Sequence, residues 1–265
     1  MKNFNIKIEY KNQKDVFILF SALNSMGYND ENNNQGMHPI RKKVRNYLLA
    51  CNWSKKYPEL NKIIKKRHPA QLLMKILQRL SISDFKKFSK EPLIQKLWTK
   101  FKNPQEKEIK KIFPSFQREV VYLIRFINKK PSDVKKIVLI INLLDAYWRG
   151  YGFKIAKTGY VIVGPGADKN QGELLRHELL HILAPNLRFP TKILPPSKSL
   201  VNMGYNNKKI IGREYIIRGL NLLYEEKILK NKLSKIIKRE QREFPAIKEV
   251  LDVLEEKLKK KKGGH

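Results

Sequence analysis

The alternation of apolar and polar residues along the first half of the chain predicts one strand followed by helices. Residues Phe4 to Tyr10 alternate with a period of two, which is typical of a half-buried strand. After them the apolar positions recur with a helical period, and the Asn-rich stretch 27–36 is predicted to be a loop. The predicted helices cover 14–26, 38–52, 69–80, 84–101 and 104–128. His38 and His68 each precede a proline at a helix start, so we interpret them as surface or capping residues rather than metal ligands.

The pattern changes at Pro131. Ile137 to Ile141 and Tyr160 to Val163 are continuous apolar runs rich in β-branched residues, separated by the Gly- and aromatic-rich segment Tyr147 to Gly152. We predict two strands of a small sheet, with one edge available to an extended peptide. A helix over 134–147 is the alternative.

A further helix is predicted over about 170–184. Asp168 to Asn170 offers N-cap residues after Gly164-Pro165-Gly166, and Pro185 closes the segment. Its apolar positions are Leu174, Leu175, Leu179, Ile182 and Leu183.

This helix contains the pentapeptide His177-Glu178-Leu179-Leu180-His181. Residues i and i+4 share a helix face, so both imidazoles can reach one Zn²⁺ at about 2.0–2.1 Å. Glu178 would then lie beside the metal, where a carboxylate can act as general base toward a metal-activated water. The competing interpretation is an ordinary histidine pair on a partly exposed helix.

The arrangement of a strand that leads through Gly164-Pro165-Gly166 into an H-E-x-x-H helix resembles the zincin metallopeptidases. These differ in the third metal ligand. A metzincin has a glycine and a third histidine soon after the motif, but the next histidine here is His265 at the C-terminus. The downstream aspartate, Asp252, lies in a charged C-terminal helix.

A glutamate from a second helix, the gluzincin arrangement, remains. Residues 211–223 are amphipathic, and Glu214 follows His181 by 33 residues with Pro195-Pro196 between them. Arg218 lies one turn beyond Glu214 and could hold its carboxylate in a ligating rotamer. Glu225 and Glu226 are alternative ligands, and an exposed Glu214–Arg218 ion pair is the alternative role.

Three sequence blocks resemble an uncharacterised bacterial family of predicted gluzincin peptidases, catalogued as a domain of unknown function. They are Tyr160 to Pro165, His177 to Asn186 and Glu214 to Arg218. The resemblance implies that His177, His181 and Glu214 bind the metal and that Glu178 is the base.

An oxyanion-stabilising donor is also expected in such a site. Arg218, Tyr205, Tyr215 and Tyr224 are candidates by their proximity to the third-ligand helix, although Tyr215 and Tyr224 fit a packing role better.

The composition adds a strong positive charge. The 265 residues carry a net charge of +32, from 43 Lys and 13 Arg against 24 acidic residues. Lys outnumbers Arg, the better bidentate reader of phosphates and bases, so we interpret most of this charge as solvated surface. It would favour acidic substrates and non-specific contact with nucleic acid.

The remaining composition fits a cytoplasmic protein. The single cysteine, Cys51, excludes an internal disulfide framework, and no apolar run is long enough to cross a membrane. The N-terminus also lacks a signal-peptide pattern.

We therefore expect an α+β fold with a zincin-like core at 131–235, a mostly helical region at 1–130 and a basic helical tail at 236–265. The expected function is a zinc-dependent metallopeptidase. One alternative is a catalytically inactive zincin-fold protein that binds nucleic acid or an acidic protein, and another is an interaction module without metal.

Overall fold

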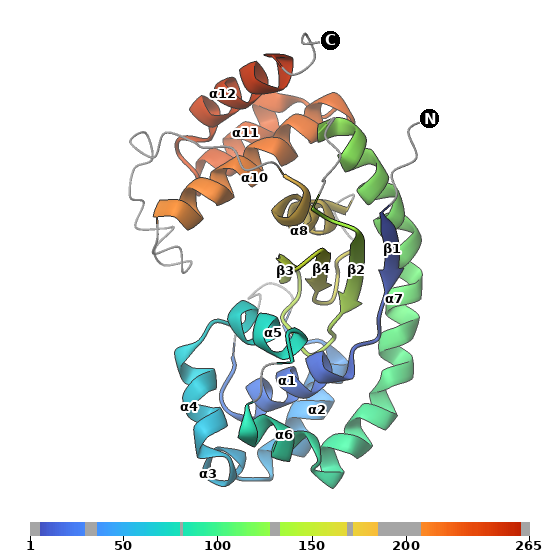
Figure 1. The fold of residues 1–265 in the computed structure, drawn as a ribbon. Coiled ribbons are helices and arrows are strands. Elements are labelled where there is room, and N and C mark those ends of the chain that lie inside the picture. Colours follow the sequence, from blue (N-terminus) through green and yellow to red (C-terminus); the bar gives the residue numbers. More distant parts are fainter. Residues whose placement is uncertain are drawn as a thin grey trace. The chain divides into compact units, whose positions relative to one another are not determined.

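The chain folds into an α+β structure with many helices and one small sheet (Figure 1). The computed structural model describes residues 6–29, 36–79, 82–127, 133–168, 172–184 and 208–260. The strands are β1 (Lys7–Tyr10), β2 (Lys136–Ile141), β3 (Gly150–Ile155) and β4 (Thr158–Val163). The helices are α1 (Lys14–Ser25), α2 (Pro39–Leu49), α3 (Trp53–Lys56), α4 (Pro58–Lys66), α5 (Pro69–Leu77), α6 (Ser83–Ser89), α7 (Pro92–Ile127), α8 (Glu173–Leu183), α10 (Lys208–Lys227), α11 (Leu233–Gln241) and α12 (Ile247–Lys260).

The chain divides into two compact units. The first comprises 1–120 and 132–178, and the second comprises 121–131 and 179–265. The units change between 131 and 132, next to the predicted boundary at 130–131, but the residues on its two sides are not separate units, because β1 pairs with β2 in one sheet of the first unit. The predicted boundary at 235–236 falls inside α11 and within the second unit.

The sheet has the order β1-β2-β4-β3, with β1, β2 and β4 parallel and β3 antiparallel to β4. The strands predicted over 137–141 and 160–163 are confirmed, so the helix considered for 134–147 is wrong. β1 confirms the described part of the N-terminal strand, whereas Phe4 lies outside the described residues. β3 was not predicted, because its two glycines weaken the β-pattern of Gly150 to Ile155.

The helices predicted in the first half of the chain are confirmed for α1, α2 and α5, whereas the predicted bounds of the later helices are corrected. A break was predicted between residues 101 and 104, but α7 runs without interruption through Pro104 and Pro114. The segment predicted as one helix over 84–101 instead changes from α6 to α7 at Pro92, where proline suits a first helical turn. α3 and α4 were not predicted.

Both histidines that precede a proline cap helices, as predicted. The Ile40 amide donates to His38 Nδ1 at 3.3 Å, and the Ala70 amide donates to His68 Nδ1 at 3.3 Å. Each side chain thereby satisfies one of the unpaired amides of a first helical turn.

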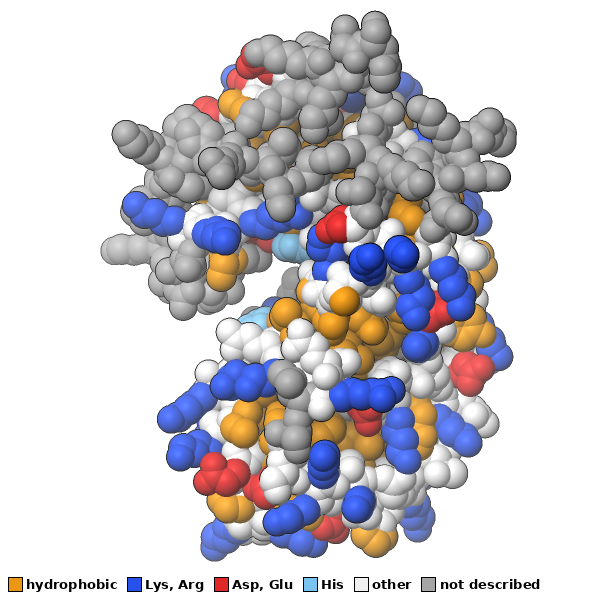
Figure 2. Space-filling model, in the orientation of Figure 1, with side chains coloured by type: hydrophobic (Ala, Val, Ile, Leu, Met, Phe, Trp, Pro, Cys, Tyr) orange, Lys and Arg blue, Asp and Glu red, His pale blue; other side chains and the backbone are white. Residues whose placement is uncertain are grey.

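Lysine and arginine side chains are spread over the face of the molecule shown in Figure 2, where acidic side chains are fewer. This agrees with the dispersed positive charge predicted from the sequence. No helix in the described ranges is long and apolar enough to cross a membrane.

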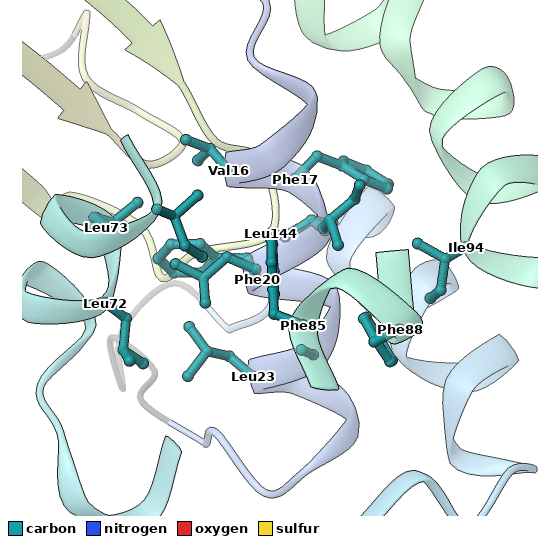
Figure 3. Close-up of a cluster of buried hydrophobic side chains, with 14 of the residues drawn as sticks. Val16, Phe17, Phe20, Leu23, Leu72, Leu73, Phe85, Phe88, Ile94 and Leu144 are labelled. Carbon is teal, nitrogen blue, oxygen red and sulfur yellow. The ribbon is translucent and has the colours of Figure 1, made fainter. Parts of the chain in front are cut away.

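The hydrophobic core of the first unit surrounds α1 (Figure 3). Val16 to Asn24 are all buried, so this helix is enclosed on every side rather than lying on the surface. Figure 3 shows its side chains among those of α5, α6, the start of α7 and the turn after β2. The labelled residues are Val16, Phe17, Phe20, Leu23, Leu72, Leu73, Phe85, Phe88, Ile94 and Leu144.

A buried carboxylate lies beside this core. Asp145, in the turn after β2, is 1% exposed. Burial raises the pKa of Asp145 to about 6, although Asp145 Oδ1 accepts hydrogen bonds from Tyr28 Oη at 2.6 Å and from the Ala146 amide at 2.8 Å. The cost of desolvating the charged form therefore exceeds the gain from these two donors.

Asp145 should make the stability of the protein depend on pH. Between about pH 4 and 6 the unfolded chain loses this proton while the folded chain keeps it, so the free energy of unfolding should fall by about 2–3 kcal/mol as pH rises. Urea denaturation across this range should show a smaller fall in Asp145→Asn than in wild type. The control is Asp133→Asn, since the Asp133 side chain is 59% exposed. Equal slopes in wild type and Asp145→Asn would contradict the assignment.

Candidate metal centre

The H-E-x-x-H motif lies in α8, within the helix predicted for it. Leu175, Leu179 and Leu180 are buried and anchor this helix, whereas His177 and His181 are half-buried. α8 is uninterrupted, so helix geometry places the two imidazoles one turn apart on one face.

Glu214 of α10 joins the two histidines. One potential ligand atom from each of His177, His181 and Glu214 lies within 4.8 Å of the other two. Among the described residues, these three form the group of His, Cys, Asp or Glu side chains that could hold a metal ion. In this group of three residues, His181 Nε2 and Glu214 Oε2 are 3.5 Å apart. The structure thus brings together the three residues that the sequence selected from distant positions.

The donor set fits zinc, and so does the separation between two of its three ligand atoms. Imidazole nitrogen and carboxylate oxygen are both zinc ligands, and two such atoms about 2.0–2.2 Å from a tetrahedral ion are about 3.4 Å apart. The observed 3.5 Å between His181 Nε2 and Glu214 Oε2 agrees with that separation. If these three residues bound zinc, a fourth coordination position would be left for water, as in catalytic zinc sites.

Arg218 and His181 approach different oxygens of the Glu214 carboxylate. Its Nε donates to Glu214 Oε1 at 2.9 Å, while Oε2 is the oxygen that approaches His181. The Glu214 side chain is 3% exposed, so this pair is not the exposed surface pair considered as the alternative. A buried carboxylate needs such a partner to remain charged.

The C-terminal helical region in turn holds Arg218. The guanidinium donates to Glu240 Oε2 of α11 at 2.7 Å and lies 4.2 Å from the centre of the Phe244 ring. α12 packs on α10 as well, since Leu254 and Val250 lie against Gly219. Residues of α11 and α12, in the described part of the predicted basic tail, therefore pack against the helix that carries Glu214.

Arg213 links α10 to the end of α8. Its guanidinium donates to the main-chain oxygens of His181, at 3.3 Å, and Ala184, at 3.2 Å. Carbonyls in the last turn of a helix have no partner within the helix, and a cation is favourable there. Burial lowers the pKa of Arg213, and the neighbouring Glu214 carboxylate opposes this effect. The sequence did not indicate this contact, because it depends on how two distant segments pack.

Glu178 faces β3 through two glycines. A Cβ added to Gly150 would lie 2.5 Å from Glu178 Oε1, and one added to Gly152 would lie 2.0 Å from the Glu178 main-chain oxygen. β3 can therefore approach α8 only because these two positions lack side chains. Glu178 is 5% exposed, so its carboxylate is largely removed from bulk water.

Of the predicted oxyanion donors, Tyr215 and Tyr224 have packing roles. Tyr215 is fully buried, its hydroxyl accepts from the Ala246 amide at 3.4 Å, and its ring contacts Phe244. The Tyr224 ring packs edge-on against Phe126. Tyr205 lies outside the described residues. Arg218 is placed to orient Glu214.

The alternative third ligands lie elsewhere. Glu225 is buried and accepts from Asn221 Nδ2 at 3.1 Å, and it belongs to no cluster with the motif histidines within the described residues. The same holds for Glu226, which is half-buried.

Comparison with known proteins gave no match: no family model, no curated protein and no solved structure is significantly similar to the chain. The resemblance to zincin peptidases therefore stays a prediction that rests on the motif blocks of the sequence.

Proposed function

We propose that the protein is a zinc-dependent metallopeptidase of the zincin type, with the gluzincin ligand set. The observation that carries this proposal is the cluster of His177, His181 and Glu214 next to a buried Glu178. A histidine pair with only a structural role would not require a buried glutamate from a distant part of the chain to lie 3.5 Å from His181 Nε2.

The residues of the site have distinct roles in this proposal. Zinc held by the three ligands would polarise a peptide carbonyl and lower the pKa of a water molecule toward about 7. The Glu178 carboxylate would serve as the proton acceptor for an attacking water and as the proton donor to the departing amide nitrogen. Arg218 orients Glu214, and Arg213 ties the ligand helices together.

The sheet suggests how a peptide substrate would bind. β3 is an edge strand, and among the described strands it pairs only with β4. An extended peptide can add to such an edge through main-chain hydrogen bonds. Because β3 contacts Glu178 through Gly150 and Gly152, a peptide on this strand would be close to the proposed base. The net charge of +32 would favour acidic substrates by long-range attraction.

An inactive zincin-fold binding protein is the second candidate, and the net charge of +32 is the observation in its favour. Such a protein would bind zinc without hydrolysing peptides and would bind polyanions with a steep dependence on salt.

Metal content tests the proposed site directly. We expect about one zinc per chain by elemental analysis of protein purified without a histidine tag, and its loss in His177→Ala and in Glu214→Ala. Glu225→Ala is the matched control, because Glu225 is a buried glutamate of the same helix outside the cluster, and it should keep the metal. Absence of zinc from the wild-type protein would refute the proposal.

A further inference from the structure

An exposed tyrosine of α2 lies beside a lysine of α7 in the first unit, and both helices carry a further exposed lysine one turn away. Tyr47 is 46% exposed, and Lys43, Lys96 and Lys100 are exposed too. Lys43 lies one helical turn before Tyr47 in α2, and Lys96 lies one turn before Lys100 in α7. Lys100 Nζ lies 3.1 Å from the Tyr47 hydroxyl and 5.0 Å from the ring centre. We call these four residues the Tyr47 patch.

The local electrostatic potential at the Tyr47 patch is positive. The pKa of Tyr47 is lowered, first by the hydrogen bond from Lys100 and then by the charges of Lys100, Lys96 and Lys43. Within the part of the chain that the structure describes, none of these three lysines forms an ion pair with a carboxylate.

Another lysine beside aromatic rings shows the contrast. Lys56 lies over Trp53 and Tyr57, but Glu91 lies 2.7 Å from its ammonium group and neutralises it, and both rings are buried. The Tyr47 patch differs because its ring is exposed and no carboxylate among the described residues pairs with its cations. Positive charge and an accessible aromatic ring therefore coincide there.

We propose that the Tyr47 patch binds single-stranded nucleic acid without sequence preference. Unpaired lysines attract the phosphates, and an exposed aromatic ring can stack on any base. Duplex DNA keeps its bases paired and stacked, so it offers Tyr47 no free base face. This inference does not depend on peptidase activity or on the metal.

The position of Tyr47 on α2 disfavours an anionic membrane as the partner. A helix that lies in a membrane interface needs a broad apolar face. The apolar residues Val44 and Leu48 of α2 are fully buried in the core, so only Leu49 accompanies Tyr47 as an exposed large apolar side chain on this helix.

The proposal can be tested by fluorescence anisotropy with a labelled oligothymidylate at several KCl concentrations. The triple variant Lys43→Gln, Lys96→Gln, Lys100→Gln should bind about tenfold or more weakly, and the slope of log K against log salt should shrink by about 2. The control triple variant Lys62→Gln, Lys65→Gln, Lys66→Gln removes the same charge from exposed positions of α4 and should bind nearly as wild type does.

The aromatic contribution has its own pair of variants. Tyr47→Ala should weaken binding about five- to tenfold, whereas Tyr122→Ala, from a tyrosine of matched exposure (45%), should not. All the substitutions are at exposed positions, so unchanged thermal unfolding is expected and would confirm that each variant is folded.

Three results would overturn the proposal: no binding by the wild-type protein, equal losses in the two triple variants, or equal behaviour of Tyr47→Ala and Tyr122→Ala. Tighter binding to phosphatidylserine-containing vesicles than to the oligonucleotide would also overturn it. Since none of these variants touches the metal cluster, zinc content should stay the same in all of them, so this test and that of the peptidase can fail independently.

Discussion

Replacing Glu178 with glutamine should reduce peptide hydrolysis by about 10²- to 10⁴-fold while leaving zinc content unchanged. Gln has nearly the same shape as Glu and should occupy the same space against Gly150, but its amide cannot accept the proton. Glu178 is also not one of the three clustered ligands, so the metal should remain. The measurement is kcat on a peptide substrate together with elemental analysis of the same samples.

Glu173→Gln is the matched control for this experiment. Glu173 lies in the first turn of the same helix, outside the cluster, so the same chemical change there should leave both hydrolysis and zinc content close to those of wild type. Full activity in Glu178→Gln would exclude Glu178 as the base. Loss of zinc in this variant would instead show that its carboxylate supports the metal.

The second large effect is expected at Gly152. A Cβ there would lie 2.0 Å from the Glu178 main-chain oxygen and 2.8 Å from its carbonyl carbon, and backbone cannot rotate out of the way. Gly152→Ala should therefore force β3 and α8 apart, lower the free energy of unfolding by about 1–3 kcal/mol and reduce hydrolysis. Thermal unfolding and peptidase assays on the same variant measure both effects.

Gly219→Ala provides the comparison. A Cβ at Gly219 would lie 2.6 Å from Leu254 Cδ1, which is the end of a flexible side chain and can change rotamer. Alanine also favours a helix interior over glycine, so the net loss of stability should be clearly smaller than at Gly152. If Gly152→Ala proved as stable as wild type, the close packing of β3 on α8 would be wrong.

Local patterns in the sequence were enough to locate most helices and the two apolar strands. α1 and β2 were predicted because apolar residues dominate them, with turn-forming residues nearby. β3 was missed because Gly150 and Gly152 remove the β-pattern, yet those glycines exist for a contact with Glu178 that the sequence cannot show. The continuity of α7 through Pro104 was also missed, because a proline in a sequence usually indicates the boundary of a helix.

The sequence predicted some residues of the candidate site more directly than others. His177, Glu178 and His181 follow from one helical turn, so their placement is set by local geometry. The sequence favoured Glu214 and left Glu225 and Glu226, on the same helix, as alternatives. The packing of α10 against α8 places Glu214, and neither of the other two, in a cluster with the motif histidines among the described residues. Arg213 and Glu240 could not be selected at all, since lysine, arginine and glutamate are abundant along this chain.

The sequence by itself determined the positions of most helices and of the two apolar strands, the H-E-x-x-H helix and the spread of positive charge, because these depend on residues close together in the chain. Glu214 and its partner Arg218 were also favoured by the sequence, but only the tertiary structure showed that Glu240 holds Arg218, that Arg213 joins α10 to α8 and that glycines bring β3 against Glu178. Those contacts join residues far apart in sequence, and their energies come from burial and close packing, which no local pattern encodes.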